Sequence, residues 1–221
     1  MKILAVDTAL GACSAAILDG ETTLAHRFEP MERGHAEALA PMVEAAMREA
    51  DVAFAALDRL AVTTGPGTFT GQRVGLAFMR GLRVALKKPL AGIMTLEAMA
   101  AAAMEETGLS VAAALHDARR GEVYAYAGSR VREIVSLRVA PFEDALKDIF
   151  AAMGKEPLAF AGTAAEAAAR DYEKLGGRAR PSTICQPDAL WVARLAALRP
   201  EPVEVPRPLY LRAPDARLPT R

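Results

Sequence analysis

Aromatic residues, cysteines and histidines are scarce in this sequence of 221 residues. Aromatic residues make up 5% of the chain, and there are two cysteines and three histidines. Cys13 and Cys185 stand far apart and match no metal-ligand spacing. Because alanine is abundant and aromatic residues are few, the composition favours helices over an all-β sandwich.

The sequence also lacks a long apolar run and an excess of charge of either sign. The N-terminal stretch MKILAVDTA contains a short apolar run that ends at Asp7, too short for a signal peptide or a membrane span. We therefore expect a cytoplasmic protein without a membrane partner. Lysine plus arginine and aspartate plus glutamate both number 27, whereas a protein that grips nucleic acid by itself usually has a basic excess. If RNA is involved, another protein is expected to hold most of it.

Hydrophobic residues make up 52% of the chain, enough for a core in one compact unit or two small lobes. The pattern predicts an antiparallel meander, turning at Asp19-Gly20, and then strands and helices in succession. The predicted strands are 3–7, 13–18, 22–28, 60–64, 89–93, 111–115, 122–127 and 158–161. The predicted helices are 35–50, 71–87, 95–106, 141–153, 164–175 and 189–198.

The second half of the chain repeats the order of the first. AVDTALGACSAAI and ALHDARRGEVYAY each contain an apolar strand, an aspartate at its end, a short loop and a returning strand. This order predicts two similar α/β lobes, the second one reduced. The expected lobes are 1–105 and 106–212. Residues 213–221 are expected to form a flexible tail, after a proline-rich stretch that prevents regular helix.

Two strand-end aspartates, Asp7 and Asp117, are the first candidate site. A carboxylate beside a tight turn can orient a metal-bound nucleotide or activate a water. Two of them facing a shared cleft is the arrangement of actin-like ATPases and sugar kinases. The alternative is that each aspartate caps its own turn through backbone amides. The sequence leaves both interpretations open.

The segment Gly65–Gly71 (GPGTFTG), between a strand and a helix, is the second candidate. Its glycines permit close backbone approach, and a helix N-terminus presents unpaired N–H groups to an anion. It is not a P-loop, because Gln72-Arg73 follow where the GK[ST] ending would stand, and it does not match G-x-G-x-x-G. A phosphate cradle and a tight turn capped by Thr68 or Thr70 are both compatible with it.

The three histidines, His26, His35 and His116, share no metal-ligand spacing. His116 faces the opposite side of its strand from Asp117, so the two cannot easily work as a dyad. His35 lies near a helix start, where a structural or interface role is expected. No Ser-His-Asp arrangement can be read from the sequence, so a hydrolase has little support.

The predicted helices 35–50 and 71–87 carry surfaces suited to close packing. Met42 and Met47 of the first offer adaptable apolar contact. The second carries small residues at three- and four-residue spacing, namely Gly71, Gly75, Ala77, Gly81 and Ala85. Three glycines weaken an isolated helix, so tight packing must support this one. Packing within the protein and an outward face for a partner both remain open.

Six segments of the chain occur together in one known family. They are ILAVDTALGACSAAI, HAEALAPMVEAAM, GPGTFTGQRVGLAFMRGL, TLEAMA, DARRGEVYA and PLYLR. Across nearly its whole length the chain thus resembles the TsaB (YeaZ) family, and GPG-x-FTG-x-R-x-G with DAR-x-GEVY is the specific part. The resemblance implies an α/β protein of the actin-like (ASKHA, ribonuclease H-like) fold, with two similar lobes that each hold a mixed sheet and helices.

The resemblance also implies a function. TsaB proteins are paralogues of the catalytic subunit TsaD and act with TsaD and the ATPase TsaE. Together these proteins install threonylcarbamoyl on N6 of adenosine 37 of tRNA (t6A). The chain is therefore expected to be a non-catalytic activator that forms a heterodimer with TsaD and reaches tRNA through the complex. A homodimer is expected in isolation.

The resemblance places the functional residues on two surfaces. The two N-terminal-lobe helices would bind the partner through His35, Leu39, Met42, Val43, Met47, Gly71, Gly75, Phe78 and Leu82. A vestigial nucleotide cleft would consist of Asp7, Thr8, Gly65, Gly67, Thr68 and Asp117.

One family motif is missing from the sequence. TsaD-like enzymes bind a metal through an H-x-E-G-H run, where this chain reads GIMTLEAM over residues 92–99, without a histidine. A metal is therefore expected in the partner only, and no cofactor is expected in this chain, with ATP or ADP possible at the complex. The competing hypothesis is an autonomous actin-like ATPase or kinase that uses Asp7, Asp117 and the Gly65–Gly71 loop.

Overall fold

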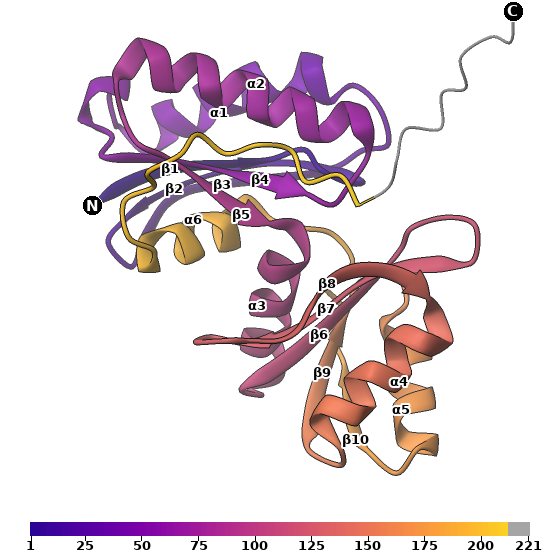
Figure 1. The fold of residues 1–221 in the computed structure, drawn as a ribbon. Helices are drawn as coiled ribbons and strands as arrows, with labels where there is room; N and C mark the ends of the chain where they lie inside the picture. The colour runs from indigo at the N-terminus through magenta and orange to yellow at the C-terminus, as the bar shows by residue number, and fades with distance from the viewer. Residues whose placement is uncertain (212–221) are drawn as a thin grey trace, which may run out of the picture.

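Two five-stranded sheets organise residues 1–211, the part of the chain that the computed structural model describes (Figure 1). The first half contains β1 (Lys2–Asp7), β2 (Ala12–Asp19), β3 (Thr22–Pro30), α1 (His35–Glu49), the 3-10 turn η1 (Phe54–Ala56), β4 (Arg59–Gly65), α2 (Phe69–Leu86), β5 (Leu90–Met94) and α3 (Thr95–Thr107). The second half contains β6 (Val111–Asp117), β7 (Glu122–Ser129), β8 (Glu133–Pro141), α4 (Phe142–Met153), β9 (Pro157–Ala161), α5 (Ala165–Lys174), β10 (Arg178–Pro181) and α6 (Ala189–Leu198). The predicted tail, 213–221, lies outside the described residues.

The two sheets have the same strand order, which confirms the internal repeat. The first runs β3-β2-β1-β4-β5 and the second β8-β7-β6-β9-β10. In each, the first three strands pair antiparallel as a meander, because short turns suffice to join antiparallel neighbours. The last two strands pair parallel to the first, and a helix makes each crossover that a parallel pair requires.

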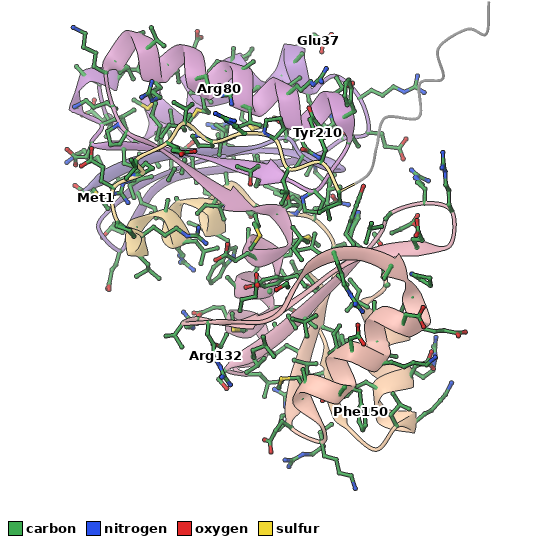
Figure 2. The ribbon with its side chains drawn as sticks, in the orientation of Figure 1. Met1, Glu37, Arg80, Arg132, Phe150 and Tyr210 are labelled. Atoms are coloured by element: carbon green, nitrogen blue, oxygen red, sulfur yellow. The ribbon has the colours of Figure 1, made fainter. Side chains whose placement is uncertain are left out.

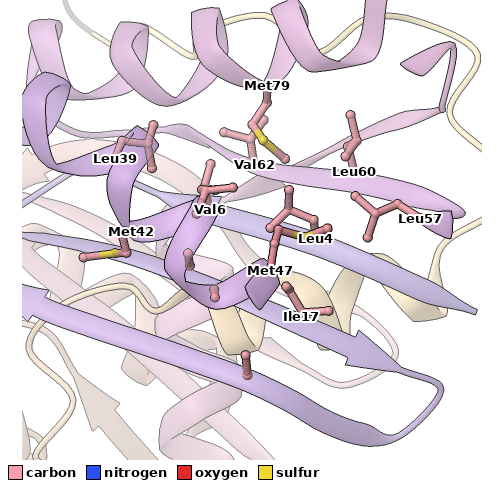
Figure 3. Close-up of a cluster of buried hydrophobic side chains, with 14 of the residues drawn as sticks. Leu4, Val6, Ile17, Leu39, Met42, Met47, Leu57, Leu60, Val62 and Met79 are labelled. Atoms are coloured by element: carbon pink, nitrogen blue, oxygen red, sulfur yellow. The ribbon is translucent and has the colours of Figure 1, made fainter. Parts of the chain in front are cut away.

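Helices cover both faces of the first sheet, with α1 and α2 on one side and α6 on the other (Figure 1). The apolar stripes of α1 and α2 face the sheet, where Met42, Met47 and Met79 belong to one buried cluster with Val6 and Val62 (Figure 3). Fully burying a side chain of this size stabilises a protein by about 1.5–3 kcal/mol. The cluster therefore fixes the two helices on the sheet.

The predicted lobe boundaries differ from the packing in two places. Helix α3, placed in the first lobe, also packs on β6, β7 and β9 of the second sheet. Helix α6, placed in the second lobe, packs on β1 and β2 of the first. Its buried side chains, Ala189, Val192, Ala193 and Ala196, are small enough for close contact with the sheet. The chain therefore returns to the first lobe after β10, and residues 200–211, here called the C-terminal segment, continue there (Figure 1).

A buried arginine ties α6 to the start of β4. Nη1 of Arg59 donates hydrogen bonds to the carbonyl oxygens of Ala196 and Arg199, at 2.6 and 2.7 Å. These are carbonyls at the C-terminal end of α6, where a positive charge is favourable. The side chain thus supplies donors to carbonyls at the end of the helix, one of which, Ala196 O, also accepts from the N–H of Arg199.

Arg59→Met is expected to lower the free energy of unfolding by about 2 kcal/mol, because hydrogen bonds to a charged group contribute about 1.5–3 kcal/mol. Urea denaturation measures the effect. Arg48→Met, on the exposed side of α1, is the control and is expected to stay within about 0.5 kcal/mol. Equal losses in the two variants would show that the cap on α6 contributes nothing.

Candidate functional site

Asp7, at the end of β1, lies in the interior of the first lobe. Its exposed fraction is 0%. Its Oδ1 accepts hydrogen bonds from Oγ1 of Thr63 at 2.5 Å and from the backbone N–H of Ala9 at 3.2 Å. Among residues 1–211, no donor reaches Oδ2. Burial raises the pKa of this carboxyl to about 7, so much of it is protonated at neutral pH.

The glycine loop packs directly on the turn that follows β1. A Cβ atom on Gly67 would lie 2.2 Å from the carbonyl oxygen of Ala9, and one on Gly71 would lie 2.2 Å from that of Thr8. No side chain fits at such distances. The glycines therefore permit close approach to the protein's own backbone.

Several polar groups of this loop are bonded within the protein. The N–H of Thr68 donates to Ala9 O at 2.8 Å, and the N–H of Gly71 donates to Oγ1 of Thr68 at 3.0 Å, the predicted helix cap. Oγ1 of Thr8 donates to Gly71 O at 2.7 Å and accepts from Gly75 N–H at 3.0 Å. Gly65 adopts φ +112°, and the side chain of Gln72 covers it.

These residues do not fit a bound nucleotide. A metal–nucleotide complex needs an ionised, accessible carboxylate, and Asp7 is neither fully ionised at neutral pH nor exposed. The two loop amides bonded to Ala9 and Thr68 are unavailable to phosphate. Above the turn, Oε1 of Gln186 accepts from the N–H of Gly11 at 2.8 Å, so a loop after β10 also closes over it.

Asp117 is exposed and caps its own turn. Its contacts are those of the turn cap, one of the two interpretations that the sequence left open. Its Oδ1 accepts from the N–H of Arg119 at 2.8 Å. Since Asp7 has no exposed surface, the two aspartates do not line one open cleft. His116 is buried beside Asp117, and desolvation lowers the pKa of its imidazole to about 4.

The other two histidines make separate structural contacts. Nε2 of His35 lies 3.0 Å from Leu10 O and holds α1 against the β1–β2 turn. Nε2 of His26 lies 2.8 Å from Oδ1 of Asp188, the N-cap of α6, and this contact raises the pKa of His26. Within residues 1–211, no three His, Cys, Asp or Glu side chains are grouped so that they could hold a metal ion.

Most of the residues predicted to bind a partner lie inside the lobe. The buried ones are Leu39, Met42, Val43, Met47, Gly71 and Gly75, and Phe78 and Leu82 are half-buried against the same core. The prediction selected the apolar stripe of each helix, and an amphipathic helix turns that stripe toward its own sheet. The six buried residues therefore cannot form an outward face, whereas Phe78 and Leu82 keep part of their surface exposed.

A different set of α2 residues points outward, and of these the sequence argument had named only Ala77 as part of a packing surface, in the stripe of small residues. Phe69 is 55% exposed and Val84 72% exposed. The guanidinium carbon of Arg73 lies 3.5 Å from the centroid of the Phe69 ring, and its Nε donates to the hydroxyl of Tyr210 at 2.8 Å. Ala77, which lies between Arg73 and Val84 in the sequence of α2, is exposed as well. The absence of any acidic residue from α2 was the available sequence signal.

Comparison with known proteins places this geometry in a family. Residues 27–215 match the family model described as TsaD: tRNA N6-adenosine threonylcarbamoyltransferase. The chain is 40% identical over 124 residues to the tRNA threonylcarbamoyladenosine biosynthesis protein TsaB of Escherichia coli K12. A Pseudomonas aeruginosa crystal structure, of an uncharacterized protein with similarity to peptidase YEAZ, matches with a TM-score of 0.80 and 34% identity. That match covers 96% of this chain and 99% of the other. The chain belongs to the TsaB (YeaZ) family.

The match to curated TsaB proteins is partial in length. The alignment with the Escherichia coli TsaB covers 56% of this chain and 53% of that protein, so the chain spans about half the length of such relatives. A full-length relative is an uncharacterized protein of Mycobacterium tuberculosis, 36% identical over 218 residues, which covers 97% of this chain and 93% of the other.

The fold of this TsaB-family chain extends to distant proteins. A ROK hexokinase from Thermus thermophilus matches with a TM-score of 0.53 at 16% identity, covering 88% of this chain and 97% of the other. A likeness at that identity shows the fold alone. The predicted two-lobed, actin-like α/β fold is thus confirmed. Over residues 1–211, no helix combines the length and the apolar character that crossing a bilayer requires.

Proposed function

We propose that this chain is a non-catalytic subunit that activates TsaD in the formation of t6A at adenosine 37 of tRNA. Two observations support the proposal. Curated relatives bear the name of tRNA threonylcarbamoyladenosine biosynthesis proteins. The Gly65–Gly71 loop, the candidate phosphate cradle, packs on the protein's own turn after β1, and Asp7 is fully buried.

The second observation carries the proposal, because a buried Asp7 is poorly suited to hold a metal-bound nucleotide. An autonomous ATPase or kinase would use Asp7, Asp117 and the Gly65–Gly71 loop, and no feature of these residues favours that activity. On this proposal the metal belongs to the partner, and ATP or ADP binds at the level of the complex with TsaD and TsaE. A cytoplasmic location is part of the same proposal.

The outward face of α2 is the surface that we assign to the partner. It combines the aromatic ring of Phe69, the stacked guanidinium of Arg73 and the small side chain of Ala77. Aromatic residues and arginine are enriched at protein interfaces, and small residues allow a second helix to approach closely. In isolation, the same face would support a homodimer, since exposed apolar patches favour association.

Reconstitution tests the proposal. The chain, TsaD, or both are incubated with TsaE, ATP, the threonylcarbamoyl donor and unmodified tRNA, and modified adenosine 37 is measured. We expect no product with the chain alone and efficient modification only with the complete mixture. ATP hydrolysis by the isolated chain, or full modification without it, would refute the proposal.

A point substitution tests the assigned face. Ala77→Arg places a bulky charge on the outward side of α2. We expect it to weaken TsaD binding at least about tenfold, because residues at the centre of an interface contribute most of the binding energy. Modification should fall in parallel. The control is Ala151→Arg, on the exposed side of α4 in the other lobe, which should leave both unchanged. Normal TsaD binding by Ala77→Arg would show that TsaD binds a surface other than the outward face of α2.

A further inference from the structure

Positive charge is concentrated along α2. The helix contains three arginines, Arg73, Arg80 and Arg83, and no acidic residue, and Lys87 and Lys88 follow it directly. The neighbouring helix α1 carries three glutamates and one arginine. Since the whole chain has 27 basic and 27 acidic residues, this segregation creates a local positive field on a neutral protein.

A groove lies between the C-terminal half of α2 and the C-terminal segment. One part, of about 630 Å³, is lined by Arg80, Arg83, Val84, Glu204, Val205 and Arg207. A second part, of about 460 Å³, shares Arg83, Val84 and Glu204 with the first and adds Lys87, Lys88 and Glu201 among its lining residues. Five cationic side chains therefore line the groove against two carboxylates.

The far wall of this groove is held in place by α2 itself. Nε of Arg80 donates to the carbonyl oxygen of Pro206 at 3.2 Å, and its Nη2 donates to the same atom. The N–H of Leu209 donates to Thr64 O at 2.7 Å, at the end of β4. The ring of Tyr210 stacks on Phe69 with 5.9 Å between centroids. Figure 2 labels Tyr210 of the C-terminal segment and Arg80 of the neighbouring helix α2.

The cations of the groove make no ion pair among residues 1–211, although Glu201 and Glu204 line the same groove. The ion pairs within residues 1–211 lie elsewhere, and none of them includes Arg83, Lys87, Lys88 or Arg207. Arg80 and Arg83 lie about one turn apart on α2, about 5 Å along its axis, and Lys87 follows as the C-cap of the helix. Arg80 donates to Pro206 O, so Arg83 and Lys87 carry the charges that remain available in this row.

We propose that this groove binds the sugar–phosphate backbone of RNA. Its chemistry differs from that of the outward face around Phe69. Lysine is depleted from protein interfaces and aromatic residues are enriched there, whereas the groove has two lysines and no aromatic residue among those that line it. A row of cations with no ion pair among residues 1–211 fits a polyanion, and phosphate contacts of this kind position a nucleic acid without reading its sequence. That the RNA is tRNA rests on the function proposed above.

Charge reversal at two positions tests the groove. Arg83→Glu with Arg207→Glu is introduced into the full chain, and binding of labelled, unmodified tRNA transcript to the chain–TsaD complex is followed by fluorescence anisotropy at several salt concentrations. We expect at least about tenfold weaker binding at moderate salt. The slope of log K against log salt should fall by about 1.4 to 1.8, the loss of two phosphate contacts.

Matched variants keep the test decisive. Lys147→Glu with Arg170→Glu makes the same charge change on exposed positions of α4 and α5 and should leave binding within about twofold. If the reversed variant does not fold, Arg83→Gln with Arg207→Gln replaces it and should show a smaller loss of the same kind. An unchanged salt slope overturns the proposal, as does a variant that fails to assemble with TsaD, since the groove would then be a protein contact. Failure of the proposed function would appear instead with the unaltered chain in reconstitution.

Discussion

Gly71→Ala is expected to lower the free energy of unfolding by about 3 kcal/mol or more, the upper range for overpacked cores. The new Cβ atom would lie 2.2 Å from Thr8 O and 2.6 Å from Oγ1 of Thr68. The first of these atoms is backbone and cannot rotate away. Relief requires α2 to move off the β1–β2 turn, which breaks the hydrogen bonds between Thr8 and the helix.

Gly81→Ala is the matched control for this substitution, because it changes the same residue type in the same helix. A Cβ atom at Gly81 meets nothing within 4 Å. Alanine there is expected to stabilise the protein by about 0.5–1 kcal/mol, since glycine weakens a helix interior. Thermal and urea denaturation of both variants measure the two changes in the free energy of unfolding. A small effect of Gly71→Ala, comparable to that of Gly81→Ala, would show that the contact between loop and turn is loose.

The element order was predictable because it depends on local patterns. The predicted helix 35–50 differs from α1 by one residue, and the predicted helix 189–198 coincides with α6. The strands β8 and β10 and the short turn η1 were not predicted. β10 has only four residues, two of them arginines and one a proline, and parallel pairing with β9 holds it in the sheet. Such pairing is tertiary and leaves little trace in the segment itself.

The functional faces were less predictable, because periodicity identifies two faces of a helix without saying where each one points. The resemblance placed Met42 and Met47 among the partner-binding residues, yet they fill the space over the first sheet. The exposed face of α2 depends on Phe69, Arg73 and Tyr210, of which the last is 137 residues from Arg73 in the chain. No local pattern brings those residues together.

The two strand-end aspartates differ in burial, which the sequence does not reveal. Asp7 and Asp117 occupy the same place in the two lobes, at the ends of β1 and β6. One is fully buried and the other exposed. The glycine loop packs on the turn after β1 in the first lobe. In the second lobe Gly162 packs on Leu115 O and Oγ1 of Thr163 accepts from the N–H of Asp117, yet Asp117 stays exposed.

Asp7→Asn is expected to raise the free energy of unfolding at alkaline pH by an amount that disappears in acid. Burial raises the pKa of Asp7 from its ordinary 3.8 to about 7. Below pH 3.8 the carboxyl is protonated in both the folded and the unfolded protein, and its ionisation affects stability little. Between these two pKa values the unfolded chain releases the proton and the folded protein keeps it, so stability falls as the pH rises. Above about pH 7 the loss is complete.

The size of this effect follows from the pKa change. One pKa unit corresponds to about 1.4 kcal/mol, so the advantage of asparagine should grow by about 3 to 4 kcal/mol from pH 4 to pH 8. Urea denaturation of both proteins across that range measures it. Asp51→Asn, on the exposed turn after α1, removes the same formal charge and separates this effect from a change in net charge. Parallel stability curves for the wild type and Asp7→Asn would show that Asp7 is ionised in the folded protein. That outcome would remove the protonation argument against a nucleotide at this turn and leave the argument from the burial of Asp7.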